Sequence, residues 1–306
     1  MGRASLKKQF QFAIDSCFAP GADKHSYKRQ NNNSKIKIFS YETLRYYYKM
    51  SAQFAQYVKY NNPEIKYIRE ITATDLQEYI NSKKDVWSNI TMINAKSAFK
   101  ILQAMCNQYY KKYNFNFIDG VKFKSNKAQK IRDEWMDKEI LERFITYRKE
   151  KGCTSPALLG LEIAAAFGLR VSEVCTLKGK DINLRFSNLH IHQSKGKRSR
   201  DLPINTPKKI ILCEYIKANF KEEDRIVNVR EDSVNQYLRR GLLAMNIKRF
   251  AKAKTGVHAI RKMVATQEYN RLLEKGLNNF QAETKVSQSL GHNKKRTEIT
   301  NAYIQK

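Results

Sequence analysis

One stretch of alternating residues interrupts a chain whose other patterns are helical. The runs SNLHIHQ and RSRDLPI alternate with the period of a β-strand and flank a short KGK segment. Two such runs on either side of a tight turn predict an antiparallel hairpin, with Lys195 and Lys197 at its tip. The sequence therefore predicts a mainly α fold with a small antiparallel β element, an α+β fold.

Helical periodicity covers most of the remaining chain. Apolar residues recur every three or four positions in SYETLRYYYKMSAQFAQYVKY, which predicts a helix with one buried face. TATDLQEYI predicts another, in which Thr74 and Gln77 form a capping box. Further helices are expected over PALLGLEIAAAFGLR and at about 89–110, 137–150, 207–219, 231–246, 258–274 and 280–290.

A chain of 306 residues has room for roughly two domains of about 100 to 200 residues each. Shifts in the sequence pattern divide it into four parts: a lead-in, a first domain, a linker and a second domain. Residues 1–35 contain the helical pattern LKKQFQFAIDSCF and then a cluster of Gly, Pro and Asn, and are interpreted as a basic N-terminal lead-in or arm. Residues 36–115 predict a small helical domain. Periodicity lapses over 116–134, which predicts a basic linker, and residues 135–306 predict a second, mixed domain.

The charge balance indicates a polyanionic partner. Lys and Arg total 58 against 29 Asp and Glu, a formal net charge of +29, whereas a charge of about 2 to 8 is enough to keep a small domain soluble. A surface this basic attracts nucleic acid through long-range fields. The linker cations are expected to contact phosphates, with plain solvation as the alternative: Lys122, Lys124, Lys127, Lys130 and Arg132.

Several other classes of protein are disfavoured. The five cysteines are scattered without a CxxC pair, which argues against a zinc site or a disulfide framework. No apolar run approaches the roughly 18 residues of a membrane span. Neither a DxD cluster nor an HExxH motif is present, so no metal and no cofactor are expected. A protein of the cytoplasm, without a membrane partner, is the expectation.

Four short motifs and one tyrosine are informative because of the order in which they occur. They are GLRVSE with Arg170 and Glu173, then SKGKRSRDLP, then HAIRK with His258 and Arg261, then LGH, and finally Tyr303. Each alone is a weak signal. Together they closely resemble the catalytic domain of the tyrosine recombinases, the phage integrase family, over roughly residues 135–306. The preceding helical region resembles that family's core-binding domain, mainly in YIREITATDLQEYI.

The resemblance implies a nucleophilic attack on a DNA phosphodiester. Tyr303 matches the family's nucleophile, which forms a 3′-phosphotyrosyl link and so stores the bond energy for religation. Arg170 and Arg261 match a pair that neutralises the charge on the phosphate oxygens, for which planar guanidinium groups are well suited. Glu173 matches an acidic position that orients the basic cluster.

The remaining site residues of the resemblance handle protons and contact phosphate. Lys195 matches the hairpin lysine that protonates the departing 5′ oxygen, although Lys197 and Arg198 lie close enough in sequence to compete for that role. Otherwise Lys197 and Arg198 are expected to contact DNA phosphates. His258 and His292 match two positions that hydrogen-bond the scissile phosphate and assist proton movement.

The resemblance also implies partners and an architecture. Two domains would form a C-shaped clamp on double-stranded DNA at specific recombination sites, as a homodimer on one site and a homotetramer in the synapse, associated with the nucleoid. An accessory DNA-bending protein and the choice between integration or excision of a mobile element and dimer resolution are left open. A type IB topoisomerase-like enzyme and a catalytically silent DNA-binding relative are the alternatives.

The chain departs from the family pattern near its end. The stretch between His292 and Tyr303 is longer than usual, and three residues follow Tyr303, where many relatives extend into a helix that docks on a neighbouring protomer. The contact between protomers is therefore expected elsewhere. The lead-in is also too short to be the separate arm-binding domain of some phage integrases, which favours a simple core-site system.

Overall fold

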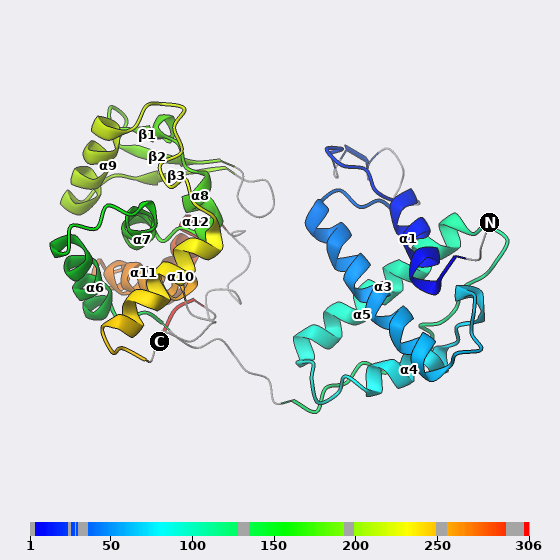
Figure 1. Ribbon diagram of the computed structural model, residues 1–306. Coiled ribbons are helices and arrows are strands. Elements are labelled where there is room, and N and C mark those ends of the chain that lie inside the picture. Colours follow the sequence, from blue (N-terminus) through cyan, green and yellow to red (C-terminus); the bar gives the residue numbers. More distant parts are fainter. Residues whose placement is uncertain are drawn as a thin grey trace. The chain divides into compact units, whose positions relative to one another are not determined.

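The computed structural model describes residues 4–23, 26, 27, 29, 36–127, 135–192, 199–248, 256–291 and 303–305. The chain divides into two compact units, Met1–Ile131 and Arg132–Lys306, and each has a hydrophobic core of its own (Figure 1). Helices dominate both units, and a three-stranded antiparallel sheet lies in the second. The predicted mainly α fold with a small antiparallel element is confirmed.

The first unit is helical in the residues that are described. Its elements are α1 (Leu6–Ser16), α3 (Tyr41–Asn61), the one-turn helix η1 (Ile68–Glu70), α4 (Ala73–Asn81) and α5 (Asn89–Tyr109). The α4 capping box consists of Thr72 and Asp75, so the prediction of Thr74 and Gln77 was wrong by two residues. Asp75 also accepts a hydrogen bond from the Asn62 amide at 2.5 Å, a tertiary contact that favours the earlier frame.

Aromatic side chains form the centre of this first core. The Phe54 ring lies 5.3 Å, between centroids, from the rings of both Tyr79 and Phe99. Phe10 of α1 is fully buried and lies 6.3 Å from Phe54. Figure 1 shows α1 against α3 and α5, and the three helices are in contact. The stretch that was interpreted as a lead-in therefore supplies a helix of this core.

The first core also includes part of the predicted linker. Phe117 and Val121 are buried in it, so the chain is still packed when it enters the basic stretch. Lys122, Lys124 and Lys127 are exposed, as phosphate-binding side chains must be. Two further predicted contacts lie outside the described residues: Lys130 and Arg132.

The second unit combines helices with a small sheet that lies at one end of it (Figure 1). Its helices are α6 (Lys138–Glu150), α7 (Pro156–Phe167), α8 (Val171–Thr176), the one-turn η2 (Gly179–Asp181), α9 (Pro207–Asn219), α10 (Glu231–Ala244), α11 (Val257–Glu274) and α12 (Asn279–Ser289). Its strands are β1 (Ile182–Asn183), β2 (Asn188–Ile191) and β3 (Arg200–Pro203), in the order β1-β2-β3. The predicted hairpin is confirmed, with Leu189 of β2 opposite Leu202 of β3.

Helix α7 lies in the middle of this unit. It contacts α6, α8, α9, α10 and α11 (Figure 1), which explains why its sequence is apolar on nearly every side. Ser155 caps its start, Pro156 occupies the first turn, and Gly168 ends it with a left-handed φ of 65°. This sharp end sets the position of Arg170, two residues later.

Helix α10 packs against α6 at Gly241, where only a residue without a side chain fits. A Cβ atom built on Gly241 would lie 2.2 Å from the Phe144 ring, and Phe144 is fully buried. We expect Gly241→Ala to lower the free energy of unfolding of the second unit by about 1–3 kcal/mol through overpacking. Chemical denaturation measures this, and adding Phe144→Leu should recover part of the loss. Additive destabilisation in the double variant would contradict the clash.

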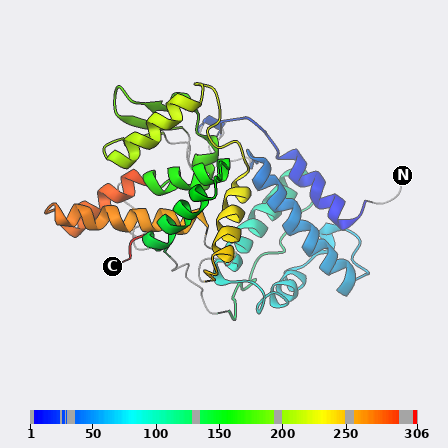
Figure 2. The same cartoon turned by 60° about the vertical axis from the view of Figure 1, so that its left-hand side comes forward.

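Helices α11 and α12 form a second, smaller core within this unit. They lie side by side (Figure 2), with Ala265, Tyr269 and Leu272 of α11 against Ala282 and Val286 of α12. A late residue of the chain, Ile304, is buried in the same cluster. Ile304 is thus packed against α11 and α12. In the described part of the chain, no helix combines the length and the apolarity needed to cross a bilayer.

Candidate active site

The site begins at the end of α7, where the chain turns into α8. The Arg170 backbone N–H donates to Glu173 Oε2 at 2.9 Å, and its Nη1 donates to Glu173 Oε1 at 2.7 Å. One carboxylate thus fixes both the main chain and the guanidinium group of Arg170. The role of Glu173 in orienting the basic cluster stays a prediction, and these contacts are the ones through which it would act.

Arg200, at the start of β3, is a residue that sequence reasoning missed. Its Nη1 and Nη2 donate to the two Glu173 oxygens, each at 2.9 Å, and its Nε donates to the Ser289 carbonyl at 2.8 Å. Bidentate pairs of this kind are strong and directional. In the sequence Arg200 is one cation of the KRSR run, and only its place on the inward face of β3 distinguishes it.

Glu173 is buried, and its arginine partners keep its carboxyl group ionised. Burial by itself raises the pKa of this carboxyl, but the hydrogen bonds and charge of Arg200, the Arg170 backbone N–H and the charge of Arg261 together lower it to about 2. The side chain is only 3% exposed. A carboxylate at this depth stays charged because guanidinium groups surround it.

Arg261 of α11 is completely buried. Its Nη1 donates to the Gly168 carbonyl at 2.7 Å and its Nη2 to the Leu290 carbonyl at 2.5 Å, while Nη1 lies 3.6 Å from Glu173 Oε2. Burial, and next the charge of Arg170, lower its pKa to about 10. Its Nε donor is buried without a partner among the described residues. An anion would relieve this concentration of positive charge.

Tyr303 lies beside this cluster, although it is far from it in sequence. Its ring centroid is 5.3 Å from that of His258, and the Arg261 guanidinium carbon is 5.5 Å from the same centroid. Both neighbours come from the first turns of α11, which presents His258 and Arg261 on one face. The structure therefore brings together five predicted residues: Arg170, Glu173, His258, Arg261 and Tyr303.

Other predicted site residues lie outside the described residues: Lys195, Lys197, Arg198 and His292. The chain enters that last position through Gly291, whose φ is 71°. A Cβ atom there would approach Arg200 Nη1 to 2.9 Å, so this close packing requires glycine.

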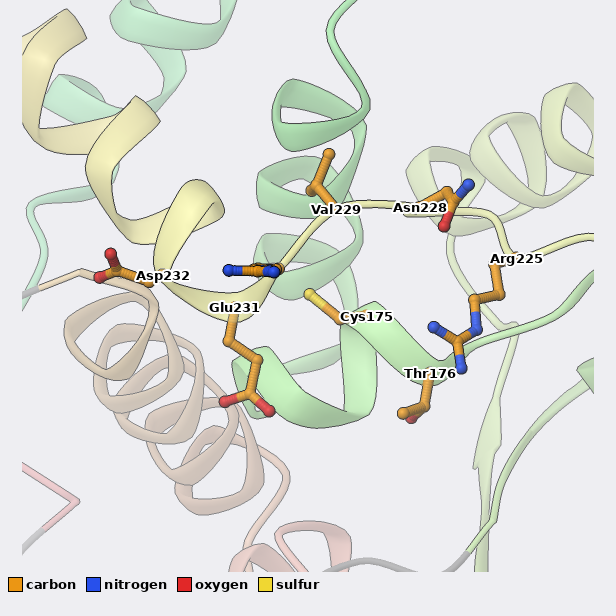
Figure 3. Close-up of a pocket in the computed structure, with 8 residues that line it drawn as sticks. Cys175, Thr176, Arg225, Asn228, Val229, Glu231 and Asp232 are labelled. Atoms are coloured by element: carbon orange, nitrogen blue, oxygen red, sulfur yellow. The ribbon is translucent and has the colours of Figure 1, made fainter.

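A hollow on the described surface lies beside α8 and is lined by other residues than Arg170, Glu173 and Arg261. It has a volume of about 540 Å³ and lies between the end of α8 and the start of α10, with Cys175, Arg225 and Glu231 among the residues of its wall (Figure 3). Its wall carries both positive and negative side chains, unlike the cationic cluster around Glu173.

Known proteins resemble this chain in sequence and in fold. A tyrosine recombinase of Thermosipho africanus (strain TCF52B) is 26% identical over 259 residues, 79% of this chain and 83% of the relative. The XerH site-specific recombinase, in a post-cleavage complex with its difH substrate, has a similar fold, with a TM-score of 0.65, 15% identity and coverage of 98% of this chain and 91% of that one.

A lambda integrase tetramer bound to a Holliday junction also shares the fold. The TM-score is 0.56 at 15% identity, over 92% of this chain and 76% of that one. The sequence model of the phage integrase family matches residues 134–306, the stretch that contains the whole Glu173 cluster and Tyr303. The order of motifs, the fold and the sequence match all agree, and the chain belongs to the phage integrase family, the tyrosine recombinases.

Proposed function

We propose that this chain is a site-specific DNA recombinase that cleaves and rejoins DNA through a 3′-phosphotyrosyl intermediate. The observation that carries the proposal is the placement of Tyr303 beside His258 and Arg261 of the same chain. A phenol, an imidazole and a fixed guanidinium group at one point provide a nucleophile, a proton-transfer group and a phosphate ligand. That combination suits transesterification of a phosphodiester.

In the proposed reaction, Tyr303 Oη forms a bond to phosphorus while His258 takes up the phenol proton. Arg170 and Arg261 neutralise the developing charge on the non-bridging oxygens. The bond from phosphorus to the 5′ oxygen breaks, and Lys195 supplies the proton that makes the departing oxygen a hydroxyl. His292 donates a hydrogen bond to the phosphate. In religation the steps run in reverse: a 5′ hydroxyl oxygen bonds to phosphorus and gives its proton to Lys195, while the bond from phosphorus to Tyr303 Oη breaks and His258 returns a proton to that oxygen.

The proposed substrate is duplex DNA held by both units, which would close around it as a C-shaped clamp. The exposed lysines at the end of the first unit support this, because phosphate contacts dominate the affinity of such proteins. Lys197 and Arg198 would add phosphate contacts from the hairpin. A homodimer on each site and a homotetramer in the synapse are proposed for this chain, in keeping with the lambda integrase tetramer.

Integration or excision of a mobile element is the proposed biological role, with dimer resolution as the second candidate. The place of action would be the cytoplasm, at the nucleoid. A type IB topoisomerase would use a similar tyrosine and basic cluster on any supercoiled DNA, so site dependence separates it from a recombinase. A silent DNA-binding relative would bind without cleaving.

The test mixes purified protein with supercoiled plasmid that carries the DNA flanking its gene, and quenches the reaction with SDS. We expect protein covalently attached to this plasmid and none on the vector without the insert. Equal attack on both plasmids would identify a topoisomerase. DNA binding without any adduct, on plasmids that together carry the whole surrounding region, would identify a silent binder.

A further inference from the structure

The backbone of Tyr303 is held by two side chains from distant parts of the second unit. Trp135 Nε1 donates a hydrogen bond to the Tyr303 carbonyl at 3.0 Å, and Thr266 Oγ1 donates to the same oxygen at 3.4 Å. The Gln305 N–H donates to Thr266 Oγ1 at 3.0 Å. Ile304, between them, is 3% exposed and packs in the cluster of α11 and α12. Residues 303–305 are thus held against α11. We call the side chains that hold them, Trp135 and Thr266 with the cluster around Ile304, the seat of Tyr303.

Trp135 is itself fixed on α11 from two sides. The Lys262 ammonium group lies 4.3 Å from the centre of the Trp135 ring, and Lys262 is 2% exposed. A cation over an indole face in so dry a place is a favourable contact. The Met136 N–H, next along the chain, donates to the Ala259 carbonyl at 3.1 Å. The indole therefore has little freedom to turn its N–H away from Tyr303.

These contacts connect the seat to the reacting groups. His258, Arg261, Lys262 and Thr266 all belong to α11, so the helix that carries the phosphate ligand also carries the anchors of the nucleophile. We propose that Trp135 is a positioning residue that holds Tyr303 in place on its own subunit for attack. The inference rests on the proposed function. It explains the hydrogen bond from Trp135 Nε1 to the Tyr303 carbonyl, which core packing alone does not require.

A fluorescence experiment tests the seat without any activity. Trp87 and Trp135 are the two tryptophans of the chain, so Trp87→Phe leaves Trp135 as the sole reporter. In that background Ile304→Asp places a charge in the buried cluster and should release residues 303–305. We expect a red shift of Trp135 emission and stronger quenching by acrylamide. Unchanged emission and quenching would overturn the proposed seat.

A kinetic experiment tests the role of the seat. Trp135→Phe keeps an aromatic ring under Lys262 but removes the N–H that Tyr303 accepts. We expect the single-turnover cleavage rate to fall about fivefold, the value of one neutral hydrogen bond from a side chain to the backbone, with DNA affinity unchanged. Trp87→Phe, the same substitution in the first unit, should cleave at the wild-type rate. An unchanged cleavage rate in Trp135→Phe would overturn the proposal.

A third reaction separates positioning of Tyr303 from support of the whole site. Tyr303→Phe protein is given a strand that ends in a 3′-(p-nitrophenyl) phosphate. The 5′ hydroxyl oxygen of a second strand bonds to phosphorus, p-nitrophenolate leaves, and the hydroxyl proton passes through Lys195 to solvent. Because Tyr303 is not the nucleophile here, adding Trp135→Phe should leave the rate unchanged. A parallel fall in this rate would mean that Trp135 merely supports the site.

The three measurements separate this inference from the proposed function. If wild-type protein forms no covalent adduct with any DNA, the recombinase proposal fails. The acrylamide result still decides whether Trp135 and residues 303–305 are in contact.

Discussion

Replacing Tyr303 with phenylalanine should abolish covalent capture of DNA, with a loss in cleavage rate on the order of 10⁴-fold or more, as expected when a nucleophile is removed. The substitution deletes one oxygen and keeps the ring that lies against His258 and Arg261. The backbone contacts of residue 303 with Trp135 and Thr266 do not involve the hydroxyl. DNA binding and thermal stability should therefore persist.

Tyr269→Phe is the matched control for this experiment. Tyr269 lies in the same cluster of α11 and α12, and its hydroxyl donates to Asn279 Oδ1 at 3.0 Å. Its loss should cost some stability but leave the adduct intact. If Tyr303→Phe still forms an SDS-resistant adduct, another residue is the nucleophile, and digestion of the adduct to a DNA-linked peptide would identify it.

Glu173→Gln should be the most destabilising change at the site. The carboxylate is 3% exposed, accepts both ends of the Arg200 fork, and lies within 3.6 Å of Arg261. Removing one partner of a buried ion pair leaves uncompensated charge and costs about 3–5 kcal/mol. We expect the thermal midpoint of the second unit to fall by about 10 °C, in line with the scaling for domains of this size. Cleavage should fall as well, because Arg170 loses its support.

The same carboxylate predicts a dependence of stability on pH. Its pKa is lowered to about 2 in the folded protein from an ordinary value of 4.5. The stability that it contributes is therefore fully present above about pH 4.5 and is lost as the pH falls toward 2. Glu173→Gln should flatten the stability profile in that window.

Glu223→Gln is the control for this experiment. Glu223 also pairs with two cations, Lys178 and Lys180, but it is 67% exposed. Its loss should leave the thermal midpoint near neutral pH unchanged, because solvent screens exposed pairs. Equal losses in the Glu173 and Glu223 variants would contradict a special role for the buried carboxylate.

Local signals in the sequence predicted most elements of the second unit, but not the short α8 and β1, and the helix expected up to Arg170 ends at Phe167. The strong start of α9, Thr206 followed by Pro207, and the alternation in β2 and β3 each depend on neighbouring residues only. The start of α4 was placed two residues too late because TATDLQ contains two overlapping capping frames. The frame that forms is the one whose Asp75 also meets Asn62 across the unit, a contact that no local pattern contains.

Features that depend on long-range packing were beyond sequence reasoning. The helix of residues 6–16 was predicted, but its burial against α3 and α5 was not, because short amphipathic helices look alike whether or not they find a partner. Within the site, the motif residues around Arg170 and Arg261 were predicted through family resemblance. Arg200 was missed because its significance comes from reaching Glu173 and Ser289, which lie 27 and 89 positions away.

The excess of positive charge around Glu173 predicts that a bound phosphodiester raises the thermal stability of the second unit. Among the described residues of this cluster, three guanidinium groups surround one carboxylate, so the protein without DNA retains internal repulsion. A bound phosphodiester would supply the missing negative charge, and a ligand that binds only the folded state raises its stability. The second unit should thus melt at a higher temperature on ordinary DNA than on DNA whose scissile phosphate is replaced by a neutral methylphosphonate. Part of the free energy of binding a phosphodiester would thus come from relieving the repulsion among these three guanidinium groups.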